Sequence, residues 1–273
     1  MSYMNKMIIA GAVAALFMIL TAIAAPVLTS YDYKAQDISI RLSPPDLKHI
    51  FGTDELGRDI FSRMLYGARV SMTVGIIAVL ISAVIGILLG AAAGFFGGLL
   101  DNIIMRFVDI MLTIPTLFLI LMLIVFLGPS IVNVMIIIGL TSWTDIARLV
   151  RAEVMSVKKL AYVDAARLIG LKRRAIIFKH IMPNILGPIF VYMTFGISGA
   201  ILTESGLSFL GLGVQPPYPS WGNILTAGKD YIHTAWWMVF YPGLAIFLAV
   251  FSYNLLGEGL RDYFNPRLKK EKK

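Results

Sequence analysis

Six long apolar runs limit what this chain can fold into. A helix needs roughly 20 apolar residues to cross a bilayer, and the runs approach or exceed that length at 7–28, 70–96, 103–127, 131 to about 147, 185–203 and 235–256. Only 15% of the 273 residues are charged, against about 25% in soluble domains, and the mean hydropathy is +0.80. The sequence predicts an all-α, polytopic membrane protein with six transmembrane helices.

Basic residues near the ends of the runs predict the orientation. The 148–179 segment holds nine Lys or Arg, and the tail from Arg261 holds six. Both segments are expected in the cytoplasm, and an even number of spans places the N-terminus there too. The 29–69 loop lies outside, where its six basic residues are balanced by six acids. The net charge of +8 therefore indicates contact with membrane lipid and not with nucleic acid.

We expect three parts in the chain. Residues 1–69 form an N-terminal transmembrane anchor and an extracytoplasmic loop, 70–260 form a five-span core, and 261–273 form a basic cytoplasmic tail. One alternative concerns the first run. Lys6 and the small residues of "AIA" at 22–24 also suit a signal peptide with a cleavage site, although the run is longer than a usual signal-peptide core.

Several kinds of chemistry find no support in the sequence. Cysteine is absent, which excludes disulfides and thiolate metal sites. The histidines at 49, 180 and 233 are on separate segments, so neither a three-histidine metal site nor any other cofactor site is expected. Gly228-Lys229 is followed by Asp230, with Asn223 where a phosphate-binding loop needs its first glycine. The sequence also shows no pairing of a nucleophile with a base, which a membrane enzyme would need.

The basic segment at about 150–183 reads as a helix, a glycine and a second helix. With 158–169 taken as helical, one arc collects Ala161, Tyr162, Ala165, Ala166, Leu168 and Ile169. Asp164 and Arg167 are three apart on the other side and can pair. Gly170 stops the helix, and 172–179 reads as a short second helix before Pro183. Periodicity alone leaves two interpretations open: an interfacial helix on anionic headgroups, or a docking surface for a soluble partner.

This segment resembles the "EAA" loop of ATP-binding-cassette importer permeases. The family pattern is Glu-Ala-Ala, three residues, Gly, nine residues, Ile, any residue, Leu, Pro. The spacing from Asp164-Ala165-Ala166 through Gly170 to Pro183 matches throughout, with Asp164, His180 and Met182 replacing Glu, Ile and Leu. The resemblance implies an ATPase-coupling loop whose residues are Ala161, Asp164, Ala165, Ala166, Arg167, Gly170, His180 and Pro183.

Four further stretches resemble the C-type transmembrane subunit of dipeptide, oligopeptide and nickel importers. They are "FGTDELGRDIFSRMLYGARVSM", "AGFFGGLLDNIIMRFVDIML", "GLSFLGLGVQPPYPSWGNIL" and "NLLGEGLRDYFNPRL". The resemblance implies an ABC transmembrane type-1 core in a bacterial or archaeal inner membrane. Its implied partners are a second homologous permease, two ABC ATPases that bind ATP and Mg, and an extracytoplasmic binding protein. Peptide is the first choice of substrate, with nickel or a metal chelate as the alternative.

Four residues are candidates for the translocation path or its gate. Arg106 and Asp109 lie within the third run, where charges are costly; a local ion pair between them is the simpler interpretation. Pro115 is expected to kink that run. Glu204 opens a Gly- and Pro-rich stretch at 204–223, expected to be a re-entrant gate or an outer loop, and could meet a cationic group of the substrate or a partner's arginine.

The outer stretch before the second run is expected to form an amphipathic elbow helix along the membrane, with an apolar stripe at Ile60, Phe61, Met64 and Leu65 and an Asp59–Arg63 pair. Contact with a binding protein is the alternative for this stretch, and Asp54 with Glu55 only weakly suggests a metal.

An ATP-independent secondary transporter is disfavoured because Asp109 is the only carboxylate expected well inside a span and no repeat is visible. A structural anchor for a soluble complex is the remaining competing class.

Overall fold

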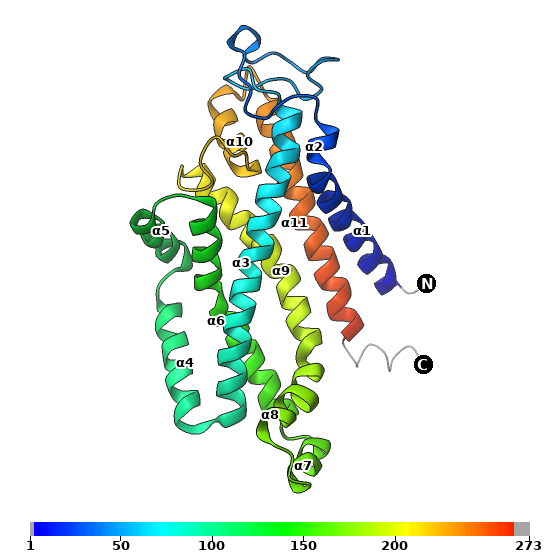
Figure 1. The fold of residues 1–273 in the computed structure, drawn as a ribbon, viewed down its shortest axis with the longest axis vertical. Coiled ribbons are helices and arrows are strands. Elements are labelled where there is room, and N and C mark those ends of the chain that lie inside the picture. The colour runs from blue at the N-terminus through cyan, green and yellow to red at the C-terminus, as the bar shows by residue number, and fades with distance from the viewer. Residues whose placement is uncertain (1–2, 265–273) are drawn as a thin grey trace.

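A computed structural model describes residues 3–264 of the chain. Five helices in this range are long and apolar enough to cross a membrane, and a bent pair could form a sixth span. The five lie in α1 (Tyr3–Ile23), α3 (Ile60–Phe96), α6 (Ile131–Val157), the continuous run 173–209 that ends in α9 (Met182–Phe209), and α11 (Trp237–Phe264). The predicted all-helical membrane fold is confirmed, and Figure 1 shows it as an elongated bundle.

The bent pair replaces the predicted third span. α4 (Gly98–Thr113) and α5 (Thr116–Leu127) meet at 86° across a break of two residues. Pro115 is the N-cap of α5 with extended backbone, which interrupts the helical hydrogen bonds completely. The predicted kink at Pro115 is therefore a sharp break. α5 continues to a turn at Gly128, whose φ is +81°.

Short helices occupy the two ends of the bundle. α2 (Ala25–Leu28), η1 (Ile38–Ile40), α10 (Trp221–Gly228) and η3 (Lys229–Tyr231) lie at the end that carries the 29–59 loop. α7 (Ala161–Leu168) and α8 (Arg173–Ala175) lie at the opposite end, and η2 (Ile176–Ile181), a π-helical stretch, leads from α8 into α9. The 204–223 stretch comprises the last turns of α9, a loop and the start of α10.

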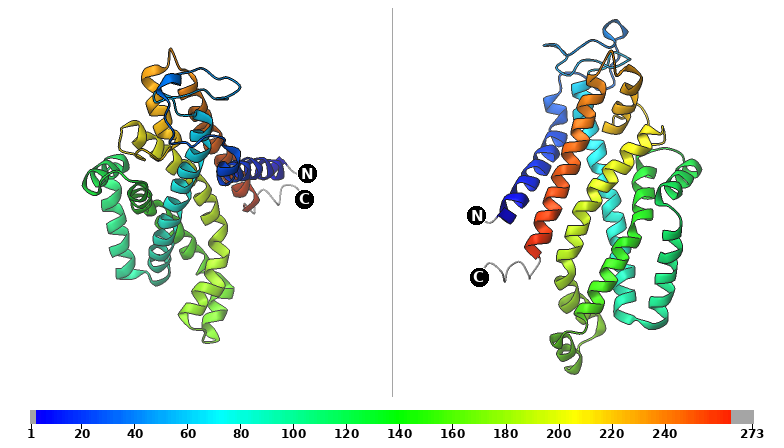
Figure 2. Two further views of the ribbon diagram at one scale, coloured as in Figure 1. Left: turned by 45° about the horizontal axis from the view of Figure 1, so that its top comes forward. Right: turned by 180° about the vertical axis from the view of Figure 1, so that it is seen from behind.

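Packing in the bundle combines two helix pairs. α3 and α6 form the central pair, and α9 packs against both. α1 lies alongside α11, and the two views of Figure 2 agree on this placement. The N-terminal end of α1 and the C-terminal end of α11 both point toward the end of the bundle that carries α7 (Figures 1 and 2). Most of the predicted tail, residues 265–273, lies outside the described residues.

The outer loop does not contain the separate elbow helix that the sequence predicts. α3 runs unbroken from Ile60 to Phe96, because no residue in that range interrupts a helix. Of the predicted apolar stripe, Ile60 and Met64 are buried in a core shared with α10 and α11, whereas Phe61 and Leu65 are half-buried. The predicted Asp59–Arg63 pair is wrong. Asp59 accepts hydrogen bonds from Ser62 N, at 2.7 Å, and from His49 Nδ1, and Arg63 approaches Asp54 instead, at 3.4 Å.

Trp236 and Trp237 differ in environment. Trp237 is buried, and its indole N–H donates to the Thr53 carbonyl at 3.1 Å. Trp236 is exposed, so only Trp236 has the position expected of an interfacial anchor. The hydrogen bond from Trp237 ties the outer loop to the first turn of α11.

Glu55 supplies a test of the electrostatics of this loop. Burial, and then the neighbouring Asp54, raises the pKa of the Glu55 carboxyl above its usual 4.5, so its charge disfavours the folded state at neutral pH. Glu55→Gln retains an acceptor for Arg58 Nη2 without the charge. We expect Tm to rise by about 1–2 °C at pH 7.5. The gain should vanish below pH 4.5, where Glu55 is protonated in both states. Thermal unfolding at both pH values checks this, and a lower Tm for the variant at pH 7.5 would contradict it.

Candidate functional site: a knob at one end and a hollow in the bundle

The segment that the resemblance singled out forms a compact knob, which we define as residues 158–181. Its first helix, α7, begins at Ala161, three residues later than the sequence predicts. α6 continues to Val157, ten residues beyond the predicted end of the fourth span, because Arg148, Arg151 and Glu153 lower the hydropathy without ending the helix. A short turn at 158–160 then separates the two helices.

Gly170 ends α7 in the way the sequence predicts. Its φ is +79°, a conformation that glycine adopts without strain. The Gly170 N–H donates to the Arg167 carbonyl at 3.0 Å and the Leu171 N–H to the Ala166 carbonyl at 3.1 Å. These two bonds are those of a Schellman motif. Gly170 therefore fixes the direction in which the chain leaves α7.

Two side chains attach α7 to the bundle. Val163 and Ala166 are buried in a cluster with Val154 and Val157 of α6 and Ile176 and Ile181 of η2. Lys158 adds a polar contact, because its ammonium group donates to the Gly94 carbonyl at the end of α3. The knob is thus packed against α6, α3 and the start of α9, and a force on it would reach all three.

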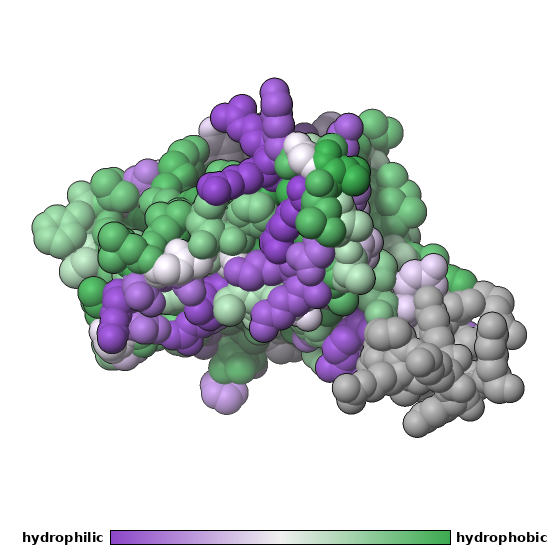
Figure 3. All heavy atoms as spheres, turned by 90° about the horizontal axis from the view of Figure 1, so that it is seen from below, coloured by the Kyte–Doolittle hydropathy of each residue, from purple (hydrophilic) through white to green (hydrophobic). Residues whose placement is uncertain are grey.

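The predicted apolar arc is mostly exposed. Of its six residues only Ala166 is buried, whereas Leu168 is 88% exposed, Ile169 76% and Tyr162 41%. The predicted Asp164–Arg167 pair is confirmed at 2.9 Å, on the surface of the knob. Pro183 is exposed at the start of α9, and His180 is half-buried, with its carbonyl accepting a hydrogen bond from the Tyr162 hydroxyl. Figure 3 looks at this end of the molecule and shows hydrophilic residues in a band with hydrophobic ones beside it.

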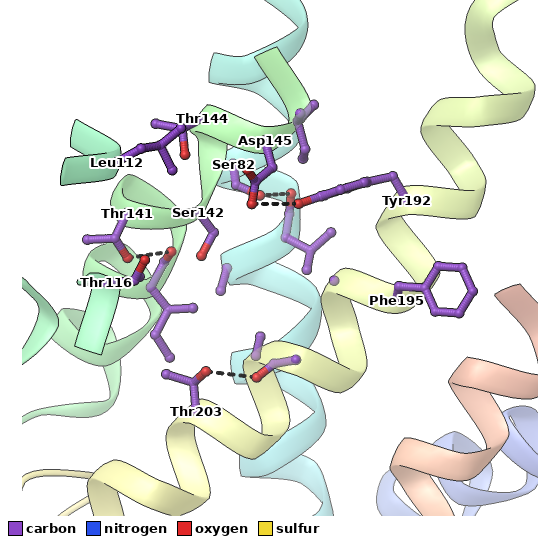
Figure 4. A pocket seen from close by; sticks show the side chains of 17 residues that line it. Ser82, Leu112, Thr116, Thr141, Ser142, Thr144, Asp145, Tyr192, Phe195 and Thr203 are labelled. Carbon is purple, nitrogen blue, oxygen red and sulfur yellow. Dashed lines mark hydrogen bonds between the residues drawn. The ribbon is translucent and has the colours of Figure 1, made fainter. Parts of the chain in front are cut away.

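A second feature is a hollow of about 320 Å³ inside the bundle. α3, α4, α5, α6 and α9 contribute to its wall, and Figure 4 shows the side chains that line it. Many of these carry hydroxyl groups: Ser82, Thr116, Thr141, Ser142, Thr144, Tyr192 and Thr203. Asp145 is the acidic residue among the lining residues. The volume falls within the usual range of small-molecule pockets.

None of the four predicted path residues is among those that line this hollow. Arg106 is exposed on α4, and the predicted Arg106–Asp109 pair is wrong, because Asp109 binds Arg148 of α6 at 2.6 Å. The neighbouring Asp101 binds Arg151 of α6 through two hydrogen bonds, of 2.5 and 2.7 Å. These pairs join α4 to α6.

Glu204 does not face solvent or a path. Its side chain is completely buried; it accepts a hydrogen bond from the Ser208 hydroxyl at 2.7 Å and one from the Ser71 hydroxyl at 3.4 Å. Ser71 in turn accepts from the Trp221 N–H at 3.1 Å. Glu204 therefore joins α9 to α3 and to the start of α10, and the expected contact with a cationic group is contradicted in this chain.

Asp145 is the residue that sequence reasoning missed. It lies close to the predicted end of the fourth run, yet in the structure it stands 14 residues after the start of α6 and 12 before its end. Asp109 is therefore not the only carboxylate inside a span. The available signal was the helical continuation of α6 past Ala147, which the polar periodicity of 148–157 could have indicated.

Comparison with known proteins gives three results. Residues 86–270 match the family described as the binding-protein-dependent transport system inner membrane component. Residues 3–45 match the N-terminal transmembrane domain of oligopeptide transport permease C. Among solved structures, the MetNI methionine ABC transporter aligns over 76% of this chain and 98% of its own, with a TM-score of 0.59 and 17% identity, which is a similarity of fold alone.

The curated relatives match along nearly the whole chain. The dipeptide transport system permease protein DppC of Alkalihalophilus pseudofirmus is 43% identical over 97% of this chain and 87% of its own. The di/tripeptide transport system permease protein DppC of Pseudomonas aeruginosa is 42% identical over 97% of this chain and 89% of its own. The oligopeptide transport system permease protein OppC of Bacillus subtilis is 40% identical over 97% of this chain and 87% of its own.

Proposed function

This chain belongs to the family of inner membrane components of binding-protein-dependent transport systems, and we propose that it is the permease subunit of an importer for di- and oligopeptides. Membership makes it an integral membrane transport subunit and not an enzyme, working with ATPase and substrate-binding partners. The observation that carries the peptide assignment is the 43% identity with a dipeptide permease across 97% of the chain.

The assembly we propose contains this chain, a second homologous permease, two ABC ATPases and an extracytoplasmic binding protein. The knob enters a groove on one ATPase, with Asp164–Gly170 at the contact. Leu168 and Ile169 are exposed and available to a partner. α7 stands at the extreme end of the molecule and not alongside the bundle (Figure 1), which favours docking to a partner and disfavours a helix lying on the headgroups.

In the proposed mechanism, ATP binding closes the ATPase pair and moves the knob. The contacts of Val163, Ala166 and Lys158 with α6, η2 and α3 pass that movement to the helices around the hollow. The path then opens alternately to the two sides of the membrane. This orientation places α7 and both chain ends in the cytoplasm, the 29–59 loop outside, and the basic tail 261–273 beside the inner headgroups.

For the division of the chain we keep the three parts that the sequence predicts. Residues 1–69 anchor the subunit and form its outer surface, 70–260 form the permease core, and 261–273 form the tail. α1 packs on α11 at the side of the bundle and contributes no residue to the hollow, which supports a peripheral role for the first part.

Transport by the reconstituted importer tests this function. The complete set of subunits is placed in proteoliposomes with ATP inside and loaded binding protein outside. We expect saturable uptake of labelled dialanine that stops without ATP. Uptake of a nickel chelate but no peptide would instead assign the metal branch. Uptake driven by a proton gradient without ATP would assign a secondary transporter.

A further inference from the structure

The hollow holds one acidic side chain at membrane depth, and that side chain lacks a charged partner within residues 3–264. Asp145 is exposed at the hollow and accepts one hydrogen bond, from the Tyr192 hydroxyl at 3.3 Å. No Lys, Arg or His nitrogen in that range lies within 4.0 Å of its carboxylate. Figure 4 shows Asp145 and Tyr192 pointing toward each other across the hollow, from α6 and α9.

Of the four other acids on the helices that wall the hollow, three are satisfied; the fourth, Glu153, lies four residues from the end of α6. Asp101 and Asp109 are paired with Arg151 and Arg148, and Glu204 is enclosed by serine hydroxyls. Pairing with a cation or complete enclosure is what a carboxylate inside a membrane normally requires. Asp145 has neither, although it lies at the middle of α6. The compensation must come from a positive charge outside the described residues, or from water in the hollow that solvates the carboxylate.

We propose that Asp145 binds the α-ammonium group of a peptide in transit, and that the surrounding hydroxyls replace the water molecules that hydrate the peptide backbone. This inference rests on the proposed function. Every unblocked peptide carries that ammonium group whatever its side chains, so one carboxylate serves a permease that accepts many sequences. The Tyr192 hydroxyl orients the carboxylate, and Ser142 and Thr144 on α6 offer donors and acceptors to the peptide amides. Thr141 and Thr203 offer acceptors, because their hydroxyls donate to carbonyls of their own helices.

A basic residue of the second permease could supply the positive charge instead. The wall of the hollow favours the peptide. A contact between two membrane subunits is expected to be closely packed, whereas this wall leaves about 320 Å³ unfilled. The hydroxyl-bearing lining suits a polar solute with its own hydrogen-bonding groups.

The test compares two ligands and four forms of the complete importer. Dialanine is the probe, and N-acetyl-dialanine lacks the ammonium group but keeps the rest. Binding to the assembled permease and ATPase complex in nanodiscs, without binding protein, is measured by saturation-transfer NMR, and dialanine uptake is measured in proteoliposomes. We expect Asp145→Asn to weaken dialanine binding and to slow its uptake roughly 10- to 100-fold, as for loss of a hydrogen bond to a charged group.

The remaining forms separate the possible outcomes. Asp145→Glu should retain most dialanine uptake, and Asp101→Asn, outside the hollow, should affect both ligands equally. N-acetyl-dialanine should bind the wild type weakly and should bind Asp145→Asn no worse. Equal losses for both ligands, together with reduced co-purification of the second permease, would assign Asp145 to the subunit interface and overturn the inference. Unchanged dialanine uptake by Asp145→Asn would overturn it too, whereas failure of the wild type to import dialanine would refute the proposed function itself.

Discussion

A permease carrying both Leu168→Asp and Ile169→Asp should lose its ATPase subunits while remaining folded in the membrane. The two side chains are 88% and 76% exposed, so folding of this chain does not depend on burying them. Burial of one such side chain in a partner's groove is worth about 1.5–3 kcal/mol, and a carboxylate there adds a desolvation cost. Docking should weaken by about 100-fold or more. Co-purification of the ATPase with tagged permease measures this, and peptide uptake should fall with it.

Two controls define the result. Leu47→Asp makes the same change at a completely exposed leucine of the outer loop, and the ATPase should still co-purify. Gly170→Pro changes the same surface by altering the backbone at the end of α7, because proline cannot adopt a φ of +79° or donate to the Arg167 carbonyl. We expect it to displace the ATPase as well, with the protein still in the membrane. Normal docking and transport by the double Asp variant would contradict the proposed role of the knob.

The knob also shows which contacts a sequence can predict. Asp164 and Arg167 are three residues apart on one short helix, and they do pair. Arg106 and Asp109 have the same spacing on α4, yet Asp109 binds Arg148, which is 39 residues away. Spacing identifies which side chains can meet on a helix, but a neighbouring helix can provide a better partner. That competitor is invisible before the helices are packed.

Two acids illustrate the same limit for the candidate path. Glu204 opens a Gly- and Pro-rich stretch that predicts a re-entrant gate or an outer loop. In the structure Glu204 still lies in α9 and is completely buried, next to Ser71 of α3. Asp145 follows an apolar run and suggests a span end, but its helix continues for 12 residues. Hydropathy predicts where helices cross the membrane. Which face of a helix turns toward a hollow depends on how α3, α6 and α9 pack.

One packing feature can be recognised in the sequence before the helices are packed. Gly86, Gly90 and Gly94 recur at every fourth residue, the small-residue spacing that lets membrane helices approach closely. In the structure these glycines face α6. A Cβ at Gly86 would lie 2.6 Å from the Ile146 Cβ, and one at Gly94 would lie 2.8 Å from the Arg151 carbonyl oxygen. The spacing could have predicted a close helix pair, though not that α6 is the partner.

Gly90→Ala should therefore prevent the permease from folding stably. Its Cβ would lie 2.4 Å from the carbonyl oxygen of Ala147 and 2.9 Å from the Cβ of Val150. The first contact is with backbone, so no side-chain rotation relieves it and α3 must move away from α6. Overpacking of this kind costs about 1–3 kcal/mol or more. Accumulation in the membrane and thermal unfolding of the purified subunit should both show the loss.

Gly206→Ala is the matched control. The substitution is the same, Gly206 also lies within a membrane helix, and nothing lies within 4 Å of its added Cβ. Alanine should be neutral there or stabilising by up to about 1 kcal/mol. If Gly90→Ala were as stable as Gly206→Ala, α3 and α6 would be farther apart in the membrane than the structure has them. Ser82 on α3 and Asp145 on α6 both line the hollow, so the hollow proposed to receive the peptide would then have a different shape, and the assignment of Asp145 would lose its geometric basis.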